Sequence, residues 1–154
     1  MKVNRLDHLV LTVADLDVTT DFYQRVLGMA AVTFKGGRRA LTFGTSKINL
    51  HQVGHEFEPK AATPVPGSAD LCFLVDELDA TGLDVIQGPV ERTGATGRIR
   101  SVYVRDPDGN LVELSTPWAI RSARICSIGS STMKHRSAVP APGCSAFGSN
   151  SCPT

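Results

Sequence analysis

Residues 6–16 read LDHLVLTVADL and residues 68–78 read SADLCFLVDEL, so one apolar strand pattern occurs twice at a constant offset of 62. Successive side chains of a strand point to opposite faces, and alternate apolar residues therefore indicate a strand with one buried face. The matched apolar pairs are Leu9 with Leu71, Leu11 with Phe73, Val13 with Val75, and Leu16 with Leu78. The repeat predicts a domain built from two similar modules.

A helix is expected after each copy of the strand. After the first copy, Asp15 or Asp17 can cap a helix that ends at Gly28. Its apolar stripe consists of Phe22, Tyr23, Val26 and Leu27. After the second copy, residues 77–86 (ELDATGLDVI) predict a shorter and weaker helix, because Gly82 lies in its middle.

Three short strands are expected after each helix, separated by glycine-rich and Asp-Pro-Asp-Gly turns. Their ranges are 30–35, 39–44 and 47–53 in the first half, and roughly 88–93, 98–105 and 110–115 in the second. Residues 54–67 contain three prolines and two glycines, and we interpret them as the connection. The fold class is α+β: two βαβββ modules, residues 3–53 and 68–116, pair into a curved mixed sheet around a cleft and form one domain over 3–117.

The chain after Pro117 has a different composition. Residues 118–154 contain eight serines, four basic residues and no acid, and we expect this basic tail to be disordered. The alternative is a helix from Trp118 to Ile128 that docks on the sheet. Three of the four cysteines lie in the tail, their spacing matches no zinc motif, and Cys72 reads as a small core residue.

Composition and charge exclude several functional classes. Of 154 residues, 42% are hydrophobic and 20% charged, which is typical of a globular domain. Residues 1–117 carry 12 basic and 15 acidic side chains, a net charge of −3, so nucleic acid is not an expected partner. No stretch approaches the roughly 20 apolar residues of a membrane span. Asp7 and His8 interrupt any signal-peptide core, and a cytoplasmic location is the expectation.

Polar residues interrupt the apolar spacing at equivalent places in the two halves. At the offset of 62, His8 matches Asp70 in the first strands. In the last strands, Glu113 interrupts NLVEL, and Asn49 and His51 interrupt KINLHQ. If the modules share one cleft, these side chains meet there, while Asp7 faces the other way and is dispensable.

The polar set predicts a metal site formed by His8, Asp70, Glu113 and either His51 or Asn49. Imidazole and carboxylate ligands suit a divalent ion, Zn, Ni, Mn, Fe or Co, and contain too much nitrogen for a calcium cage. Each residue also has a structural explanation: a histidine bonded to a carbonyl for His8, a strand cap for Asp70, and exposed strand positions for His51 and Glu113.

The residues DHLVLTVADLDVTTDFYQRVLGM, ALTFG, KINLH and YVRDPDGNLVEL resemble the glyoxalase/bleomycin-resistance/extradiol-dioxygenase group, or vicinal oxygen chelate (VOC) superfamily. Within it, KINLHQVGHEFEPKA and PGSADLCF are most similar to the glyoxalase domain-containing protein 5 branch. The resemblance implies the same metal ligands: His8, then Asn49 or His51, then Asp70 and Glu113. Metal-dependent members usually have histidine in place of Asp70, and glyoxalase I has glutamate near Asn49.

The resemblance further implies a lyase, isomerase or transferase that binds the adjacent oxygens of a small substrate to the metal. Glu113 or Asp70 could act as the base, and Tyr103, Arg100 and Arg105 could orient an anionic substrate. Two alternatives stay open. One is a metal-free protein that sequesters a drug or metabolite. The other is an extradiol-type dioxygenase with iron on His8, His51 and Glu113, and His55 as the acid-base group. A homodimer is an open expectation.

Overall fold

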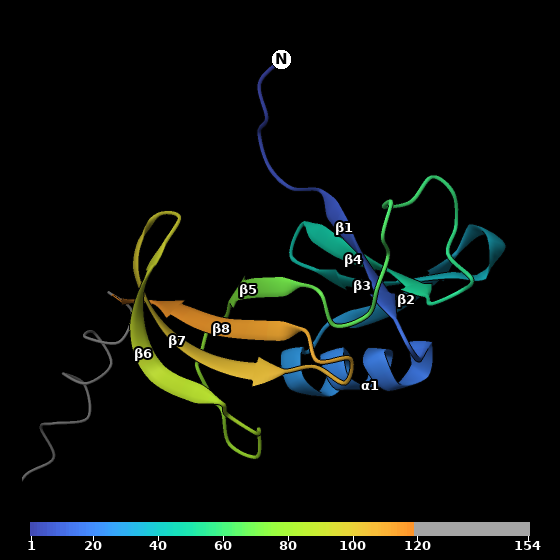
Figure 1. The fold of residues 1–154 in the computed structure, drawn as a ribbon. Coiled ribbons are helices and arrows are strands. Elements are labelled where there is room, and N and C mark those ends of the chain that lie inside the picture. Colours follow the sequence, from blue (N-terminus) through green and yellow to red (C-terminus); the bar gives the residue numbers. More distant parts are fainter. Residues whose placement is uncertain (119–154) are drawn as a thin grey trace, which may run out of the picture.

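The computed structural model describes residues 1–118. The predictions for the tail, disorder or a docked helix, concern residues that lie outside this range. Figure 1 shows two modules side by side, each with four strands. In chain order the elements are β1 (His8–Val13), α1 (Leu16–Leu27), β2 (Ala30–Phe34), the 3-10 turn Lys35–Gly37, β3 (Arg38–Phe43), β4 (Ser46–Gln52), β5 (Asp70–Leu74), β6 (Gln87–Gly94), β7 (Gly97–Arg105) and β8 (Leu111–Pro117).

The strands form two four-stranded sheets with the same topology, in the orders β1-β4-β3-β2 and β5-β8-β7-β6. In each sheet the first strand pairs in parallel with the last, and the other pairs are antiparallel. The strands β1 and β5 begin at His8 and Asp70, which differ by the offset of the repeat. The double module and the α+β class are therefore confirmed, although the strands make two sheets instead of one.

Helix α1 follows β1 as predicted. Its N-cap is Asp15, whose carboxylate accepts hydrogen bonds from the backbone N–H groups of Asp17 and Val18 at 2.8 and 3.0 Å. Gly28 ends the helix with a left-handed backbone, φ 62°. Asp15 is thus the cap, and Asp17 lies in the first turn of the helix.

The second predicted helix is wrong. Residues 75–86 contain turns and bends but no helix, and Gly82 has φ 78°, a conformation that a helix does not contain. The segment nevertheless packs its apolar residues on the second sheet: Leu78, Ala80, Leu83 and Val85. The apolar spacing at 77–86 therefore reflected core contacts made by an irregular chain.

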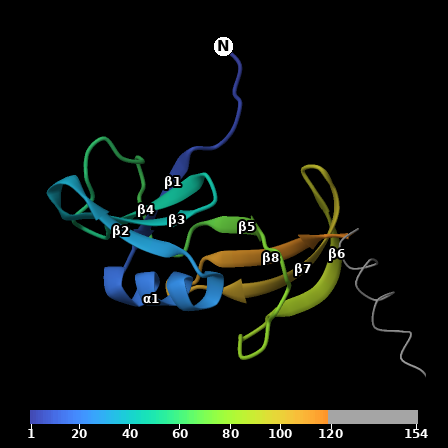
Figure 2. The ribbon, with the colours of Figure 1, turned by 180° about the vertical axis from the view of Figure 1, so that it is seen from behind.

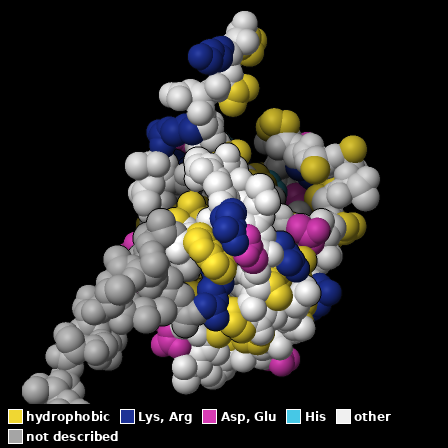
Figure 3. Space-filling model, turned by 90° about the vertical axis from the view of Figure 1, so that its left-hand side faces the viewer, with side chains coloured by type: hydrophobic (Ala, Val, Ile, Leu, Met, Phe, Trp, Pro, Cys, Tyr) yellow, Lys and Arg dark blue, Asp and Glu magenta, His cyan; other side chains and the backbone are white. Residues whose placement is uncertain are grey.

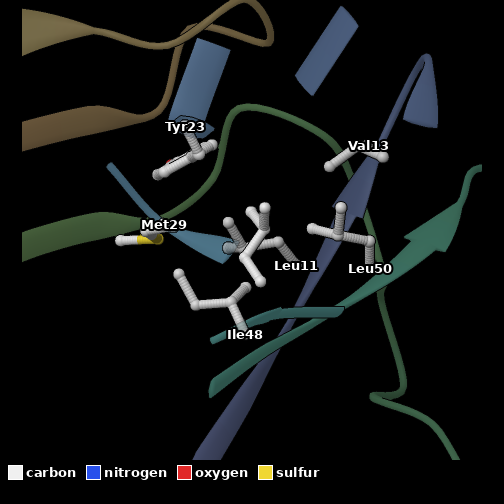
Figure 4. Close-up of a cluster of buried hydrophobic side chains, with 7 residues drawn as sticks. Leu11, Val13, Tyr23, Met29, Ile48 and Leu50 are labelled. Carbon is white, nitrogen blue, oxygen red and sulfur yellow. The ribbon is translucent and has the colours of Figure 1, made fainter. Parts of the chain in front are cut away.

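Helix α1 packs against both modules. The first core cluster contains Leu11, Val13, Tyr23, Met29, Leu41, Ile48 and Leu50, most of them labelled in Figure 4. The second contains Val102, Val104, Val112 and Leu114. Phe22 and Leu27 of α1 contact both clusters. In Figures 1 and 2, α1 lies below the place where the modules meet, so one face of each sheet is turned away from this helix.

The turn between β7 and β8, residues 106–110, connects the second module to α1. Asp108 accepts hydrogen bonds from the Ala14 N–H at 2.8 Å and from the Thr19 hydroxyl at 3.2 Å. The buried Tyr23 hydroxyl donates to Asp106 at 3.0 Å. Asp108 lies beside the start of α1, where the helix dipole favours negative charge, and Asp106 contacts the helix farther along, at Tyr23. Within residues 1–118, no helix has the length and apolar character to cross a membrane.

Candidate functional site

The face of the first sheet turned away from α1, here called the first open face, carries three of the predicted ligands. Leu9 and Leu11 of β1 pack in the core, so His8 and Val10 point to the other side. In the parallel register Val10 pairs with Asn49. The β4 residues on this face are Lys47, Asn49 and His51, and β3 adds Arg38, Ala40 and Thr42.

The corresponding face of the second sheet, the second open face, carries the other two predicted ligands. Phe73 and Leu114 belong to the core side, so Asp70 and Cys72 of β5 face away from α1, as does Glu113 of β8. Ser101 and Tyr103 of β7 lie on the same face, because they pair with Ser115 and Glu113.

The registers show which residue of β4 corresponds to Glu113. Val10 pairs with Asn49 in the first sheet, and Cys72 pairs with Glu113 in the second. Val10 and Cys72 are equivalent at the offset of 62, so Asn49 is the structural counterpart of Glu113. The Asn49 Oδ1 atom is also buried without a hydrogen-bond partner, and such an atom is costly unless something binds it.

A single chain does not bring the predicted ligands together. His8, Asn49 and His51 share the first open face, whereas Asp70 and Glu113 lie on the second. Among residues 1–118, no three His, Cys, Asp or Glu side chains are grouped so as to hold a metal ion. The ligand set is therefore divided between the two sheets.

Asp7 contacts His8, contrary to the expectation that it faces away. Its Oδ1 lies 2.7 Å from His8 Nδ1, and the two side chains are 73% and 46% exposed. The strand begins at His8, so alternation along the strand does not govern Asp7. The hydrogen bond from His8 holds the pKa of Asp7 below its usual value. An ionised Asp7 accepts a hydrogen bond from the His8 Nδ1–H, and in this tautomer Nε2 carries the free lone pair.

His51 lies in a cluster with Arg38 of β3 and Phe57 of the connection. The Phe57 ring meets the His51 ring edge-on at 5.4 Å between centroids, and the Arg38 guanidinium lies 4.4 Å from the Phe57 centroid. Burial lowers the pKa of His51, and the positive charge of Arg38 lowers it further. His51 is therefore neutral at pH 7, the form that binds metals. The sequence pattern missed Arg38 and Phe57; the Gly36-Gly37 turn before Arg38 was the available signal.

Glu113 belongs to a hydrogen-bonded group on the second open face. Ser115 Oγ donates to Glu113 Oε1 at 3.3 Å and lies 2.9 Å from Ser101 Oγ and 3.5 Å from Cys72 Sγ. Although the residue is exposed, partial desolvation of its sulfur raises the pKa of the Cys72 thiol, and the Glu113 carboxylate raises it further, while the Ser115 hydrogen bond acts in the opposite direction. Cys72 is exposed, which corrects the prediction that it is a core residue.

Three residues of β7, Arg100, Tyr103 and Arg105, were predicted to orient a substrate. Tyr103 lies on the second open face, and its hydroxyl accepts a hydrogen bond from Arg92 Nε at 2.9 Å. Arg100 pairs with Glu91 and Thr116 on the opposite face. Arg105 donates to the Gly109 carbonyl at 2.7 Å and stabilises the turn. The arginine beside Tyr103 is therefore Arg92, which the sequence pattern did not single out.

The exposed charges on the β6 side of the molecule are mixed. In the view of Figure 3, basic and acidic side chains alternate with apolar ones, and Arg98 of this module forms an ion pair with Glu91. Among the described residues visible in this view, basic and acidic side chains are thus intermixed.

The fold has two four-stranded modules of the same topology, with a helix after the first strand of the first module, and each sheet has a polar face turned away from that helix. The sequence profile of the Glyoxalase/Bleomycin resistance protein/Dioxygenase superfamily matches residues 5–114. The chain belongs to this superfamily.

Three curated proteins of different names are similar to this chain in sequence. Virulence protein STM3117 of Salmonella typhimurium is 58% identical over 123 residues, 75% of this chain and 85% of that protein. Glyoxalase domain-containing protein RDO1 of Mycosarcoma maydis is 56% identical over 124 residues, 75% of this chain and 70% of that protein. Metallothiol transferase FosB of Bacillus licheniformis is 30% identical over 123 residues, 75% and 77% of the two chains.

A solved structure extends the comparison to three dimensions. The crystal structure of virulence protein STM3117 matches with a TM-score of 0.72 and 56% identity, and the match covers 75% of this chain and 98% of that one.

Proposed function

We propose that the protein is a metal-dependent enzyme of the glyoxalase superfamily that acts on a small, oxygen-rich substrate bound to a divalent ion. The proposed ligands are His8, Glu113 and Asp70, with His51 or Asn49. The observation that supports the proposal is positional: the first and last strands of both modules carry a His, Asn, Asp or Glu side chain on an open face.

The donor chemistry fits a divalent transition metal such as Zn, Ni, Mn, Fe or Co. His8 offers Nε2, since its Nδ1 is bonded to Asp7. His51 is a neutral imidazole, because burial lowers its pKa. The unpartnered Asn49 Oδ1 is a further oxygen donor on the same face. Carboxylates of the second open face supply the negative charge that a divalent ion requires.

We infer that two copies of the chain complete the site, as a homodimer. The two open faces carry complementary halves of the ligand set, histidines on the first and carboxylates on the second. Both faces also expose apolar side chains that a partner would cover: Val10, Val32 and Phe34 on the first, and Leu74 on the second. Contact between the first open face of one copy and the second open face of another unites both halves.

The residues of the chain have defined parts in this reaction. A bound divalent ion would polarise adjacent substrate oxygens and stabilise the negative charge that develops on them. Glu113 would help to hold the ion, and its carboxylate could also serve as a base for a proton next to a substrate carbonyl. The Tyr103 hydroxyl accepts from Arg92, so its own proton remains available to a substrate oxygen.

Metal content tests the proposal. Protein purified without a chelator or an affinity tag is analysed by mass spectrometry for bound metal. We expect stoichiometric metal in the wild type and loss of most of it in His8→Ala and Glu113→Gln. Glu91→Gln is the matched control, because Glu91 is a strand carboxylate on the other face of the second sheet. Equal metal contents in Glu113→Gln and Glu91→Gln would remove Glu113 from the ligand set.

The second candidate is sequestration of a small molecule without metal. The exposed apolar side chains of the open faces favour it, since Leu74 is 63% exposed and Val10 46% exposed. Wild-type protein that holds no metal under these conditions would support this candidate and contradict the enzyme.

A further inference from the structure

The strands of the first open face contribute basic side chains but no acid, and Asp7, which precedes β1, is bonded to His8 at its edge. Its strand residues include Arg38 and Lys47 together with His8, Asn49 and His51. Among residues 1–118, neither Arg38 nor Lys47 forms an ion pair with an Asp or Glu. Arg38 and Lys47 therefore carry positive charge that no ion pair within residues 1–118 neutralises.

Both cations are placed on aromatic rings. The Arg38 guanidinium lies 4.4 Å from the Phe57 centroid, and the Lys47 ammonium lies 5.0 Å from the Phe34 centroid. A ring face orients a cation and leaves its N–H groups free to bind an anion. Arg38 has five such donors in a planar fork, which suits carboxylate and phosphate oxygens.

The connection between the modules fixes this arrangement. In Figure 1 it passes over the side of the first sheet away from α1. Glu56 accepts hydrogen bonds from the Gly54 N–H at 2.9 Å and from Lys60 Nζ at 3.1 Å. Glu56 is an acid of this connection, and these two donors occupy its carboxylate. Phe57 follows it directly and contacts both Arg38 and His51.

We propose that Arg38, stacked on Phe57 beside His51, binds an anionic group of the substrate, a carboxylate or a phosphate, with Lys47 as a second positive charge. This inference rests on the proposed function in one respect: the bound anion is a substrate only if the protein is the proposed enzyme. It narrows the substrate class to small molecules that carry a negatively charged group in addition to the chelating oxygens.

Anion titrations test the inference. Inorganic phosphate and acetate are added in separate experiments to the full chain, with and without bound metal, and the His51 ring signals are followed by NMR. We expect a saturable shift with at least one anion, and at least about tenfold weaker binding in Arg38→Gln. The anion that binds more tightly distinguishes phosphate from carboxylate recognition.

Arg39→Gln is the matched control, since Arg39 is the next residue, lies on the opposite face and pairs with Asp17. It is expected to bind the anions as the wild type does. Equal affinities in Arg38→Gln and the wild type, or the absence of a saturable shift in the wild type, would overturn the inference.

The metal content of the same samples separates the two proposals. Arg38→Gln with wild-type metal content and weak anion binding supports both. A wild type that binds no metal but binds anions through Arg38 contradicts the metalloenzyme and leaves the anion site supported.

Discussion

The hydrogen bond between Asp7 and His8 links a residue outside the strand to a proposed ligand. The carboxylate fixes which imidazole nitrogen carries the proton, and such outer partners typically change metal affinity 10- to 100-fold. We predict that Asp7→Asn weakens metal binding by roughly tenfold, measured by competition with a chromophoric chelator. Asp76→Asn, an exposed acid of the second module, is the control; equal affinities in the two variants would show that the contact has no effect on the metal.

Cys72 provides a second test at this scale. Partial desolvation of the sulfur and the Glu113 carboxylate both raise the pKa of the Cys72 thiol, so little thiolate exists at pH 7. Removing the negative charge in Glu113→Gln should lower this pKa and speed alkylation of Cys72 by iodoacetamide severalfold. Peptide mass spectrometry separates Cys72 from the other cysteines. An unchanged or slower rate would contradict the contact between Glu113 and Cys72.

At the scale of elements, the turn at residues 106–110 connects the modules through α1. The buried Tyr23 hydroxyl donates to Asp106, which Asn110 also contacts at 2.8 Å. Tyr23→Phe should therefore lower the free energy of unfolding by about 1 kcal/mol, measured in urea. Tyr103→Phe removes a half-buried hydroxyl from the second open face and should cost less. A larger loss in Tyr103→Phe would contradict the structural importance of this turn.

The Gly82→Ala substitution distinguishes the observed irregular segment from the predicted helix, because the two predict opposite signs for the change in the free energy of unfolding. A helix would gain about 0.5 to 1 kcal/mol from Gly82→Ala. The left-handed backbone, φ 78°, makes alanine unfavourable, although no atom lies within 4 Å of an added Cβ. We predict a loss of about 1 kcal/mol in urea unfolding. A gain in stability would show that residues 77–86 are helical.

The strands and the first helix were predictable because alternation, capping and glycine act locally. His8–Val13, Ser46–Gln52 and Leu111–Pro117 follow the expected ranges within a few residues. The segment after β5 was not predictable, since Leu78 and Leu83 have a spacing that suits a helix but pack from irregular backbone. The faces of His8, Glu113 and Asp70 followed from alternation, whereas Phe57 and Arg38 meet only through the folded connection.

At the scale of the molecule, the division of the proposed ligands between two sheets could not be read from the sequence. The repeat relates His8 to Asp70 and predicts that both lie at equivalent strand positions, which they do. It does not determine whether the two open faces meet within one chain. Helix α1 packs on the core side of both sheets, so the open faces are on the other side. A second copy of the chain is therefore the proposed source of the other half of the ligand set.

The most direct test mixes two variants of the chain, each of which lacks one proposed metal ligand. His8→Ala and Glu113→Gln proteins are combined in equal amounts, subunits are exchanged, and bound metal is measured after removal of the free ion. If each site takes His8 from one copy and Glu113 from the other, random exchange yields about half mixed pairs, each with one intact site. Metal content then recovers to about a quarter of the wild-type value. Recovery of no metal above the separate variants, with exchange verified by mass spectrometry, would contradict a site shared between two copies.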